Sequence, residues 1–309
     1  MIEVLRAGLC DLVMDQGRFG YGALGVPAGG AADSAALAAA NRLVGNDADA
    51  AGLEITLSGP VLRFPVGGVV ALTGARCAAT RSSGAAVAWN ATLVLAAGET
   101  LTLGRAEAGC RCWLAVRGGL AVPSVMGSRS TFLPAGFGGF QGRALQAGDT
   151  LPMGGERGEV RRLRVQPLAS SAGAHPEGHK CLRVVAGPQT EWFDDAGLAA
   201  FFSSPYRVGA ASDRRGLRLR GSAVTHRRLE LPSQGVLPGA VQVPPDGQPI
   251  ILGWDGPVTG GYPVIAGVIA ADWPRLAQLQ PGDAVRFETI EVEAAQALAV
   301  ATWPIKETE

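Results

Sequence analysis

Polar side chains that can bind a small anion occur in glycine-rich turns along the chain. Ser128 and Arg129, within Gly127–Thr131, combine hydroxyl groups with a guanidinium group. This combination suits a carboxylate or a phosphate, because charge-assisted hydrogen bonds from arginine are strong and geometrically specific. Asp213 and Arg214 place a carboxylate beside a guanidinium group in a second turn. For these two residues an ordinary ion pair within the turn is the alternative interpretation.

Asp33 stands directly before an alanine-rich run, 35–44, that predicts a helix carrying Asn41. A carboxylate at this position either caps the helix or faces a ligand, and capping is the commoner role. Glu54 lies inside an apolar, strand-like run, where we expect it to be buried with a partner. For Tyr262 the alternative to ligand binding is core packing with a hydrogen-bonded hydroxyl group. The remaining candidate ligand contacts adjoin predicted strands: Arg117 and Gln242.

Several common binding and catalytic motifs are missing from the sequence. It contains no phosphate-binding loop of the Gly-x-x-x-x-Gly-Lys-Ser/Thr type and no Gly-x-Ser-x-Gly nucleophile turn. His175 and His179 are four residues apart, but Pro176 and Gly178 oppose the helix that would place both on one metal ion. We therefore predict no metal site.

The composition is that of a neutral globular protein. The 309 residues include 27 Lys and Arg against 27 Asp and Glu, so the chain lacks the positive charge typical of nucleic-acid binders. No apolar run approaches the ~20 residues of a membrane-spanning helix, and a hydrophobic content of 47% is too high for a disordered chain. The first residues do not resemble a secretory signal, and five scattered cysteines do not form a disulfide framework. We expect a cytoplasmic protein.

Short apolar runs separated by turn-forming residues dominate the chain, which contains 44 glycines and 20 prolines. Their length and flanking residues predict a mainly β protein built from sandwiches or barrels. A turn of the form Leu-x-x-Gly or Leu-x-Pro-Gly followed by an acidic residue recurs at 95–99, 145–149 and 279–283. Each copy precedes a predicted strand, and its glycine is expected to tolerate a positive φ angle.

Helices are predicted to be few and short. Besides 35–44, we expect one helix from a Thr190 cap to Phe202 and one or two turns after Asp272. A polar, glycine-containing segment, 156–180, has the composition of a surface connection. It divides the chain into two predicted β-rich domains, 1–155 and 181–309. One continuous unit with a long loop is the alternative.

The ordered set of motifs resembles one family along almost the whole chain, the biotin-dependent carboxyltransferase / allophanate hydrolase subunit 2 family. No single motif is specific, but the joint pattern is. The motifs are DxGRxGY (15–21), GVPxGGxxD (25–33), NRLVGN (41–46), LE (53–54), AVRGG (115–119), GSRST (127–131), SDRxGxRL (212–219), GAVQVP (239–244), GQP (247–249), TGGYP (259–263) and LxPGD (279–283).

The resemblance implies a cyclophilin-like β-barrel fold, a related smaller partner subunit and, for the 5-oxoprolinase members, a third subunit. The implied reaction is the ATP-dependent opening of 5-oxo-L-proline to L-glutamate. The lactam is a stable amide, so phosphorylation of its carbonyl oxygen would activate the ring carbon for attack by water. ATP is expected in the assembly, without an assigned site.

Within this interpretation we expect two sets of site residues, with charge from Arg117, Asp213 and Arg214 in a cleft between the domains. The expected catalytic residues are Asp33, Arg129, Asp213 and Arg214. The expected substrate-binding residues are Asn41, Arg117, Ser128, Gln242 and Tyr262.

Two other functions stay open from the sequence. One is carboxyl transfer to urea or a related small amide, with biotin on a separate carrier, because the chain has no Ala/Val-Met-Lys-Met motif for biotin attachment. The other is non-enzymatic, as a regulatory binding partner of another protein.

Overall fold

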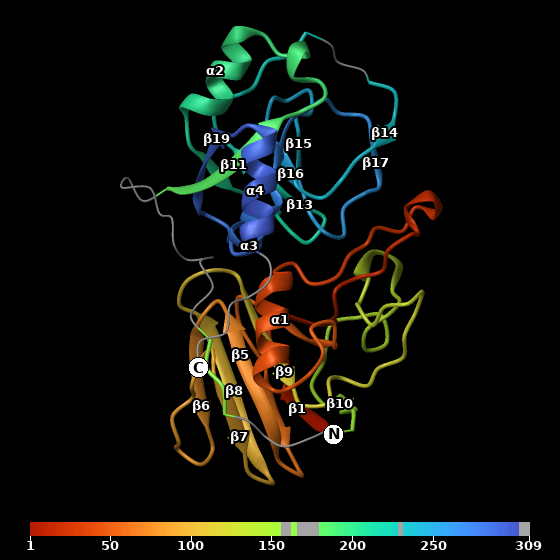
Figure 1. Cartoon of the computed structure of the whole chain (residues 1–309), viewed down its shortest axis with the longest axis vertical. Coiled ribbons are helices and arrows are strands. Elements are labelled where there is room, and N and C mark those ends of the chain that lie inside the picture. Colours follow the sequence, from red (N-terminus) through yellow and green to blue (C-terminus); the bar gives the residue numbers. More distant parts are fainter. Residues whose placement is uncertain (156–161, 166–178, 228–230, 303–309) are drawn as a thin grey trace. The chain divides into compact units, whose positions relative to one another are not determined.

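The computed structural model describes residues 1–155, 162–165, 179–227 and 231–302, and the chain divides into two compact units (Figure 1). Unit 1 contains Met1–Arg18 and the described residues of Gly29–Leu168. Unit 2 contains Phe19–Ala28 and the described residues of Ala169–Pro304. Most of the predicted connecting segment, 156–161 and 166–178, lies outside the described residues, so the predicted domain boundaries stay a prediction.

Unit 1 contains two five-stranded sheets in which all strand pairs are antiparallel. The first sheet has the order β10 (Thr150–Leu151), β1 (Ile2–Arg6), β4 (Val61–Phe64), β8 (Glu99–Ala106) and β6 (Cys77–Arg81). The second has the order β2 (Cys10–Met14), β3 (Gly52–Thr56), β9 (Arg111–Val116), β5 (Gly68–Gly74) and β7 (Thr92–Leu95).

The second sheet separates two apolar cores, because successive side chains of a strand point to opposite faces. Val13 packs in the core that contains residues of both sheets. Its neighbours Leu12 and Met14 pack in the other core, with residues of the helix α1 (Ser34–Leu43). Figure 1 shows α1 alongside β5 and β9, which it contacts. The result is a layered unit of sheet, sheet and helix.

Helix α1 confirms the helix predicted at 35–44 and shows why it begins there. The Asp33 carboxylate accepts a hydrogen bond from the amide of Ala36 at 2.9 Å, so it caps the first turn. Leu37 and Ala40 belong to the helix face buried on the second sheet. Of the two roles that the sequence left open for Asp33, capping is the one that the geometry displays.

Unit 2 is a closed barrel of seven strands, which confirms the mainly β fold with a β-barrel and few short helices. Parallel pairing of β11 with β19 closes it, and the other pairs are antiparallel. The barrel order is β11 (Lys180–Ala186), β18 (Val264–Val268), β15 (Ala240–Gln242), β16 (Ile250–Leu252), β13 (Gly216–Arg220), β12 (Tyr206–Val208) and β19 (Ala284–Thr289). A separate short pair consists of β14 (Gln234–Gly235) and β17 (Thr259–Gly260).

The predicted helix from a Thr190 cap to Phe202 is wrong in its start. A single 3-10 turn, η4 (Thr190–Trp192), comes first, and the helix α2 (Asp195–Ser203) begins only after it. The Asp194 carboxylate caps α2 by accepting a hydrogen bond from the amide of Gly197 at 2.7 Å. The sequence therefore contained two candidate caps, and the aspartate is the one in use.

The turn predicted after Asp272 exists as α3 (Trp273–Ala277), but the Asp272 side chain does not cap it. Its carboxylate instead accepts hydrogen bonds from Arg183, including one from Nε at 3.0 Å. The C-terminal helix α4 (Val292–Thr302) was not predicted. Further short 3-10 turns among the described residues are η1 (Gly22–Leu24), η2 (Leu133–Ala135) and η5 (Ala270–Asp272). Within the described residues, no helix is both long and apolar enough to cross a bilayer.

The recurring turn has the predicted backbone conformation in all three copies. The φ angles are +79° at Gly98, +90° at Gly148 and +91° at Gly282. The copies lead into β8, β10 and β19, respectively. A side chain at these glycines would be strained, which explains why each turn carries glycine.

A buried carboxyl group on β2 makes the stability of unit 1 depend on pH. Asp11 is 1% exposed, and burial raises its pKa to about 6, although the amide of Gly8 donates a hydrogen bond to it. In the unfolded chain an aspartate has a pKa of about 3.9. Between about pH 3.9 and pH 6, the unfolded chain therefore binds fewer protons at Asp11 than the folded chain does. The contribution of Asp11 to the free energy of unfolding therefore decreases as the pH rises through this window.

We expect Asp11→Asn to remove this pH dependence. At pH 7.5 the variant should be more stable than the wild type by about 1–3 kcal/mol, because no charged group is then buried. At pH 4 the two proteins should differ much less. Urea unfolding at a series of pH values measures this, and parallel pH profiles for the two proteins would contradict it.

Candidate functional site

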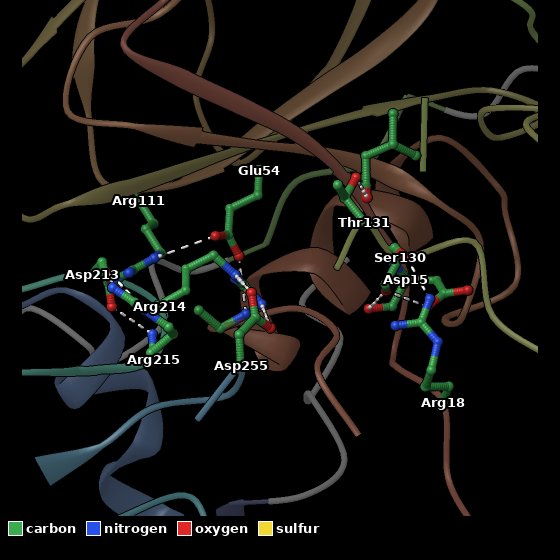
Figure 2. A network of polar contacts seen from close by, with 12 residues as sticks. Asp15, Arg18, Glu54, Arg111, Ser130, Thr131, Asp213, Arg214, Arg215 and Asp255 are labelled. Carbon is green, nitrogen blue, oxygen red and sulfur yellow. Dashed lines mark hydrogen bonds and ion pairs between the residues drawn. The ribbon is translucent and has the colours of Figure 1, made fainter. Parts of the chain in front are cut away.

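The Asp15 carboxylate, directly after β2, organises a polar cluster in unit 1 (Figure 2). Its Oδ1 accepts hydrogen bonds from the hydroxyl groups of Ser128 and Ser130, both at 2.6 Å, and from the amide of Gly17 at 2.9 Å. Its Oδ2 accepts a hydrogen bond from the amide of Arg129 at 2.5 Å. Asp15 is 8% exposed, so the carboxylate fixes the 128–130 turn from inside the protein.

Ser128 is used within this cluster rather than presented to a ligand. It is 1% exposed, donates to Asp15, and accepts a hydrogen bond from the amide of Ser130 at 2.9 Å. In this structure the hydroxyl group positions the turn, and its predicted ligand-binding role stays a prediction. Sequence reasoning recognised the hydroxyl–guanidinium motif but not that Asp15 occupies the hydroxyl groups.

Arg129 differs from its neighbours because its side chain is exposed. Its Nε donates to the carbonyl oxygen of Val122 at 3.0 Å, which tethers the guanidinium group. Within the described part of the chain, its two terminal nitrogens donate to no protein acceptor. The arrangement presents a held guanidinium group whose two terminal nitrogens can form a paired hydrogen bond with a carboxylate or phosphate.

A second carboxylate, Glu54 on β3, lies fully buried, as we expected, beside Arg111 (Figure 2). The distance from Arg111 Nε to Glu54 Oε1 is 3.3 Å. The other oxygen, Oε2, accepts a hydrogen bond from the amide of Ala32 at 3.0 Å. Since the amide of Ala31 donates to the carbonyl oxygen of Asp15, the segment before Asp33 is held by the Glu54 side chain and by the backbone of Asp15.

Asn41 and Arg117 belong to another network, at the end of α1. The Asn41 side chain donates to the carbonyl oxygen of Ala50 at 2.7 Å and accepts from Asn46 Nδ2 at 3.0 Å. Asn46 in turn accepts a hydrogen bond from the amide of Gly118 at 2.8 Å, next to Arg117. Asn41 is 0% exposed and Arg117 is 3% exposed. The structure therefore brings these two predicted residues together, but with the Asn41 amide engaged by the protein.

In unit 2, Asp213 and Arg214 do not pair with each other as predicted, and each pairs with a different residue (Figure 2). Arg214 binds Asp255 through two hydrogen bonds, at 2.8 Å from Nε and 3.0 Å from Nη2, and both residues are buried. Asp213 pairs with Arg215 instead, at 2.8 Å, with side-chain exposures of 48% and 66%. The expectation of an Asp213–Arg214 ion pair is therefore wrong, and Asp255 is the partner that sequence reasoning did not assign.

Gln242 and Tyr262 also lie close together in unit 2. Gln242 is buried, and its amide nitrogen donates to the backbone carbonyl oxygen of Tyr262 at 3.4 Å. The Tyr262 side chain is 42% exposed, which argues against the core-packing alternative. A side chain at Gly260 would approach Gln242 Nε2 to 2.5 Å, so this glycine makes room for the amide.

Chemically, this arrangement of side chains is suited to binding and positioning a ligand. The exposed guanidinium group of Arg129 can hold an anion, and the buried pairs fix the backbone around it. Among the described residues, no cluster of three or more His, Cys, Asp or Glu side chains is arranged to hold a metal ion. The role of every predicted site residue in catalysis stays a prediction, as does the cleft expected between the domains.

The comparison with protein families decides the classification. The family model "Carboxyltransferase domain, subdomain A and B" matches residues 24–289. The chain belongs to this carboxyltransferase-domain family. The match confirms the resemblance drawn from the sequence motifs, of which all but the first, at 15–21, lie within the matched residues.

Relatives of this carboxyltransferase domain occur both as free-standing chains and within larger proteins. The chain is 43% identical to a 5-oxoprolinase subunit from Escherichia coli, over 96% of this chain and 93% of that protein. It is 33% identical to the equivalent 5-oxoprolinase subunit from Haemophilus influenzae, over 96% and 94%. The crystal structure of the K. lactis urea amidolyase matches with a TM-score of 0.85 and 30% identity, over 99% of this chain but 20% of that one.

Proposed function

We propose that this protein is a subunit of an ATP-dependent 5-oxoprolinase, which opens 5-oxo-L-proline to L-glutamate. The observation that carries the proposal is the 43% identity to the E. coli 5-oxoprolinase subunit over nearly the full length of both chains. In the overall reaction, ATP and two water molecules convert the lactam to glutamate, ADP and phosphate. Phosphorylation of the lactam oxygen would activate the ring carbon, and water would then break the C–N bond.

The proposed contribution of unit 1 is anion binding by Arg129. Its terminal nitrogens face no protein acceptor in the described part, and Asp15 fixes its backbone. Ser128 acts as a positioning residue for the same turn. In unit 2, Arg214 and Asp255 form a buried pair whose proposed role is to hold the 253–256 turn. We assign no chemical step to a single residue and no ATP site to this chain.

The proposed assembly contains further subunits, because the bacterial relatives are each named as one subunit of a 5-oxoprolinase. We propose a related smaller subunit of cyclophilin-like fold and a third subunit. Within the described part of the chain the five cysteines form no disulfide bond, which fits a reducing compartment such as the cytoplasm.

Carboxyl transfer is the second candidate, because the fold also matches the K. lactis urea amidolyase. In that case urea or a related amide would be the acceptor, and the carboxyl group would arrive on biotin. The biotin would belong to a separate carrier, since this sequence lacks the lysine motif for its attachment.

The two functions are separated by assaying this chain together with its cognate partner subunits. Glutamate formation from 5-oxo-L-proline and ATP, independent of biotin and bicarbonate, supports the first proposal. Urea-dependent ATP hydrolysis that requires bicarbonate and a biotinylated carrier, without glutamate formation, would overturn it.

We expect Arg129→Gln to lower kcat/KM of the assembled enzyme by roughly 10- to 100-fold. This corresponds to a charge-assisted hydrogen bond of about 1.5–3 kcal/mol. The loss should appear mainly in KM if Arg129 only binds the substrate anion. The exposed Arg105 on β8 offers a matched control, because Arg105→Gln removes a similar charge elsewhere in unit 1. If the two variants have the same kcat/KM, Arg129 does not belong to the site.

A further inference from the structure

A pocket of about 330 Å³ lies in unit 1 next to the turn that carries Arg129. Its lining is apolar or uncharged: Val122, Pro123, Val125, Gly136, Phe137, Gly138, Gly139, Phe140, Gln141, Gly142 and Pro152. The volume is at the lower end of the range of small-molecule sites, roughly 300 Å³ and above. The pocket therefore suits a metabolite of about amino-acid size with a compact apolar body.

The glycine-rich wall of this pocket is fixed by close backbone contacts. A side chain at Gly138 would come within 2.2 Å of the carbonyl oxygen of Ser130, and one at Gly139 within 1.9 Å of Thr131 Oγ1. Both glycines have positive φ angles, +70° and +54°. The wall thus packs directly on the turn organised by Asp15, and only glycine permits this approach.

Arg129 is joined to this pocket by two hydrogen bonds. Its Nε donates to the carbonyl oxygen of Val122, and its own carbonyl oxygen accepts from the amide of Gly139 at 3.1 Å. Val122 and Gly139 both line the pocket. The terminal nitrogens of Arg129, which lack a protein acceptor in the described part, are therefore tethered at the border of an apolar cavity.

The charges around the pocket favour an anion. The Arg18 guanidinium carbon lies 4.8 Å from the ring centre of the lining residue Phe137, which adds a second positive charge behind the wall. Arg143 lies over Phe140, and its charge is balanced by Asp149 at 2.7 Å. The Asp15 carboxylate, which contributes a negative charge to this region, accepts four hydrogen bonds from the 128–130 turn and Gly17.

We propose that this pocket binds a small carboxylic acid, with the carboxylate on Arg129 and the apolar body against Val125, Phe137 and Phe140. A single exposed guanidinium group matches one carboxylate, whereas a polyphosphate requires several donors and charges. 5-Oxo-L-proline belongs to this class, so the inference rests on the proposed function in naming the substrate as its natural ligand. The ligand chemistry itself does not depend on that function.

Calorimetric titration of the full chain with three probes tests the proposal. Cyclopentanecarboxylate has both the charge and the apolar ring, cyclopentylmethanol lacks the charge, and acetate lacks the ring. We expect saturable binding of cyclopentanecarboxylate, at least tenfold tighter than either other probe. Equal binding of the alcohol, or no binding of the carboxylate, would overturn the proposal.

Variants locate the bound probe. Arg129→Gln should weaken cyclopentanecarboxylate binding at least tenfold, and Arg129→Lys should weaken it less, because lysine keeps the charge but not the planar fork. Val125→Phe, which fills the pocket, should also abolish binding, and Arg105→Gln should not affect it. Binding that survives both Arg129→Gln and Val125→Phe would place the ligand elsewhere.

5-Oxo-L-proline as a fourth probe separates this inference from the proposed function. Binding of 5-oxo-L-proline that Val125→Phe blocks, together with normal turnover by that variant in the assembly, would overturn the assignment of this pocket as the substrate site. Binding of cyclopentanecarboxylate but not of 5-oxo-L-proline, with the same variant effects, supports the pocket and contradicts the named ligand.

Discussion

Replacing Asp15 by alanine is expected to lower the free energy of unfolding by about 3–5 kcal/mol and to abolish turnover by the assembled enzyme. Two buried hydroxyl groups and two backbone amides donate to this carboxylate, and the substitution leaves them without an acceptor. Each such buried donor costs about 1–3 kcal/mol, and the sum is limited because the turn can rearrange. The rearrangement would displace Arg129, whose amide binds Asp15.

A graded series separates the loss of stability from the loss of function. Asp15→Asn keeps one acceptor oxygen but replaces the other by a donor, so we expect a smaller destabilisation of about 1–3 kcal/mol. Asp49→Asn is the matched control, because that aspartate is exposed in the same unit. Urea unfolding and turnover are measured for all three variants. Wild-type stability of Asp15→Ala would contradict the organising role of this carboxylate.

Replacing Asp255 by alanine is expected to destabilise unit 2 by about 3–5 kcal/mol, because the buried Arg214 loses its bidentate partner. The neighbouring turn depends on the same arginine, since the amide of Asp255 donates to the carbonyl oxygen of Arg214 at 3.0 Å. A side chain at Gly253 would approach that same oxygen to 2.2 Å. The ion pair and the glycine together fix the turn.

Asp213→Ala provides the contrast in the same segment. Its ion pair with Arg215 is exposed, so its removal should cost no more than about 1 kcal/mol. Thermal unfolding of the two alanine variants measures the difference directly. Similar melting temperatures for Asp213→Ala and Asp255→Ala would show that burial does not distinguish the two pairs.

Local patterns predicted much of the fold. The α1 helix, its Asp33 cap and the positive φ angles of three glycines follow from residue types within a few positions, and all are confirmed. The start of α2 was wrong because Thr190 and Asp194 are both acceptable caps, and the choice depends on tertiary contacts. Helix α4 was missed because its apolar residues lack a clear amphipathic pattern, and most are exposed.

The site was predictable in its residue types but not in its pairings. Ser128 and Arg129 lie more than 110 positions from Asp15, which occupies the serine hydroxyl group. Likewise, 41 positions separate Arg214 from Asp255, whereas the sequence suggested the adjacent Asp213. Propensity and spacing carry no information on such long-range contacts. The preference for a buried Glu54 inside an apolar run is, however, confirmed.

We propose that this chain is an essential component of a 5-oxoprolinase. The most direct measurement is the rate of L-glutamate formation from 5-oxo-L-proline and ATP by the cognate partner subunits, with this chain omitted and then added back. We expect no glutamate without this chain and, on its addition, glutamate and ADP in equal amounts. Glutamate formation at the same rate without it, or none from the complete and correctly folded set, would show that this chain is not a 5-oxoprolinase subunit.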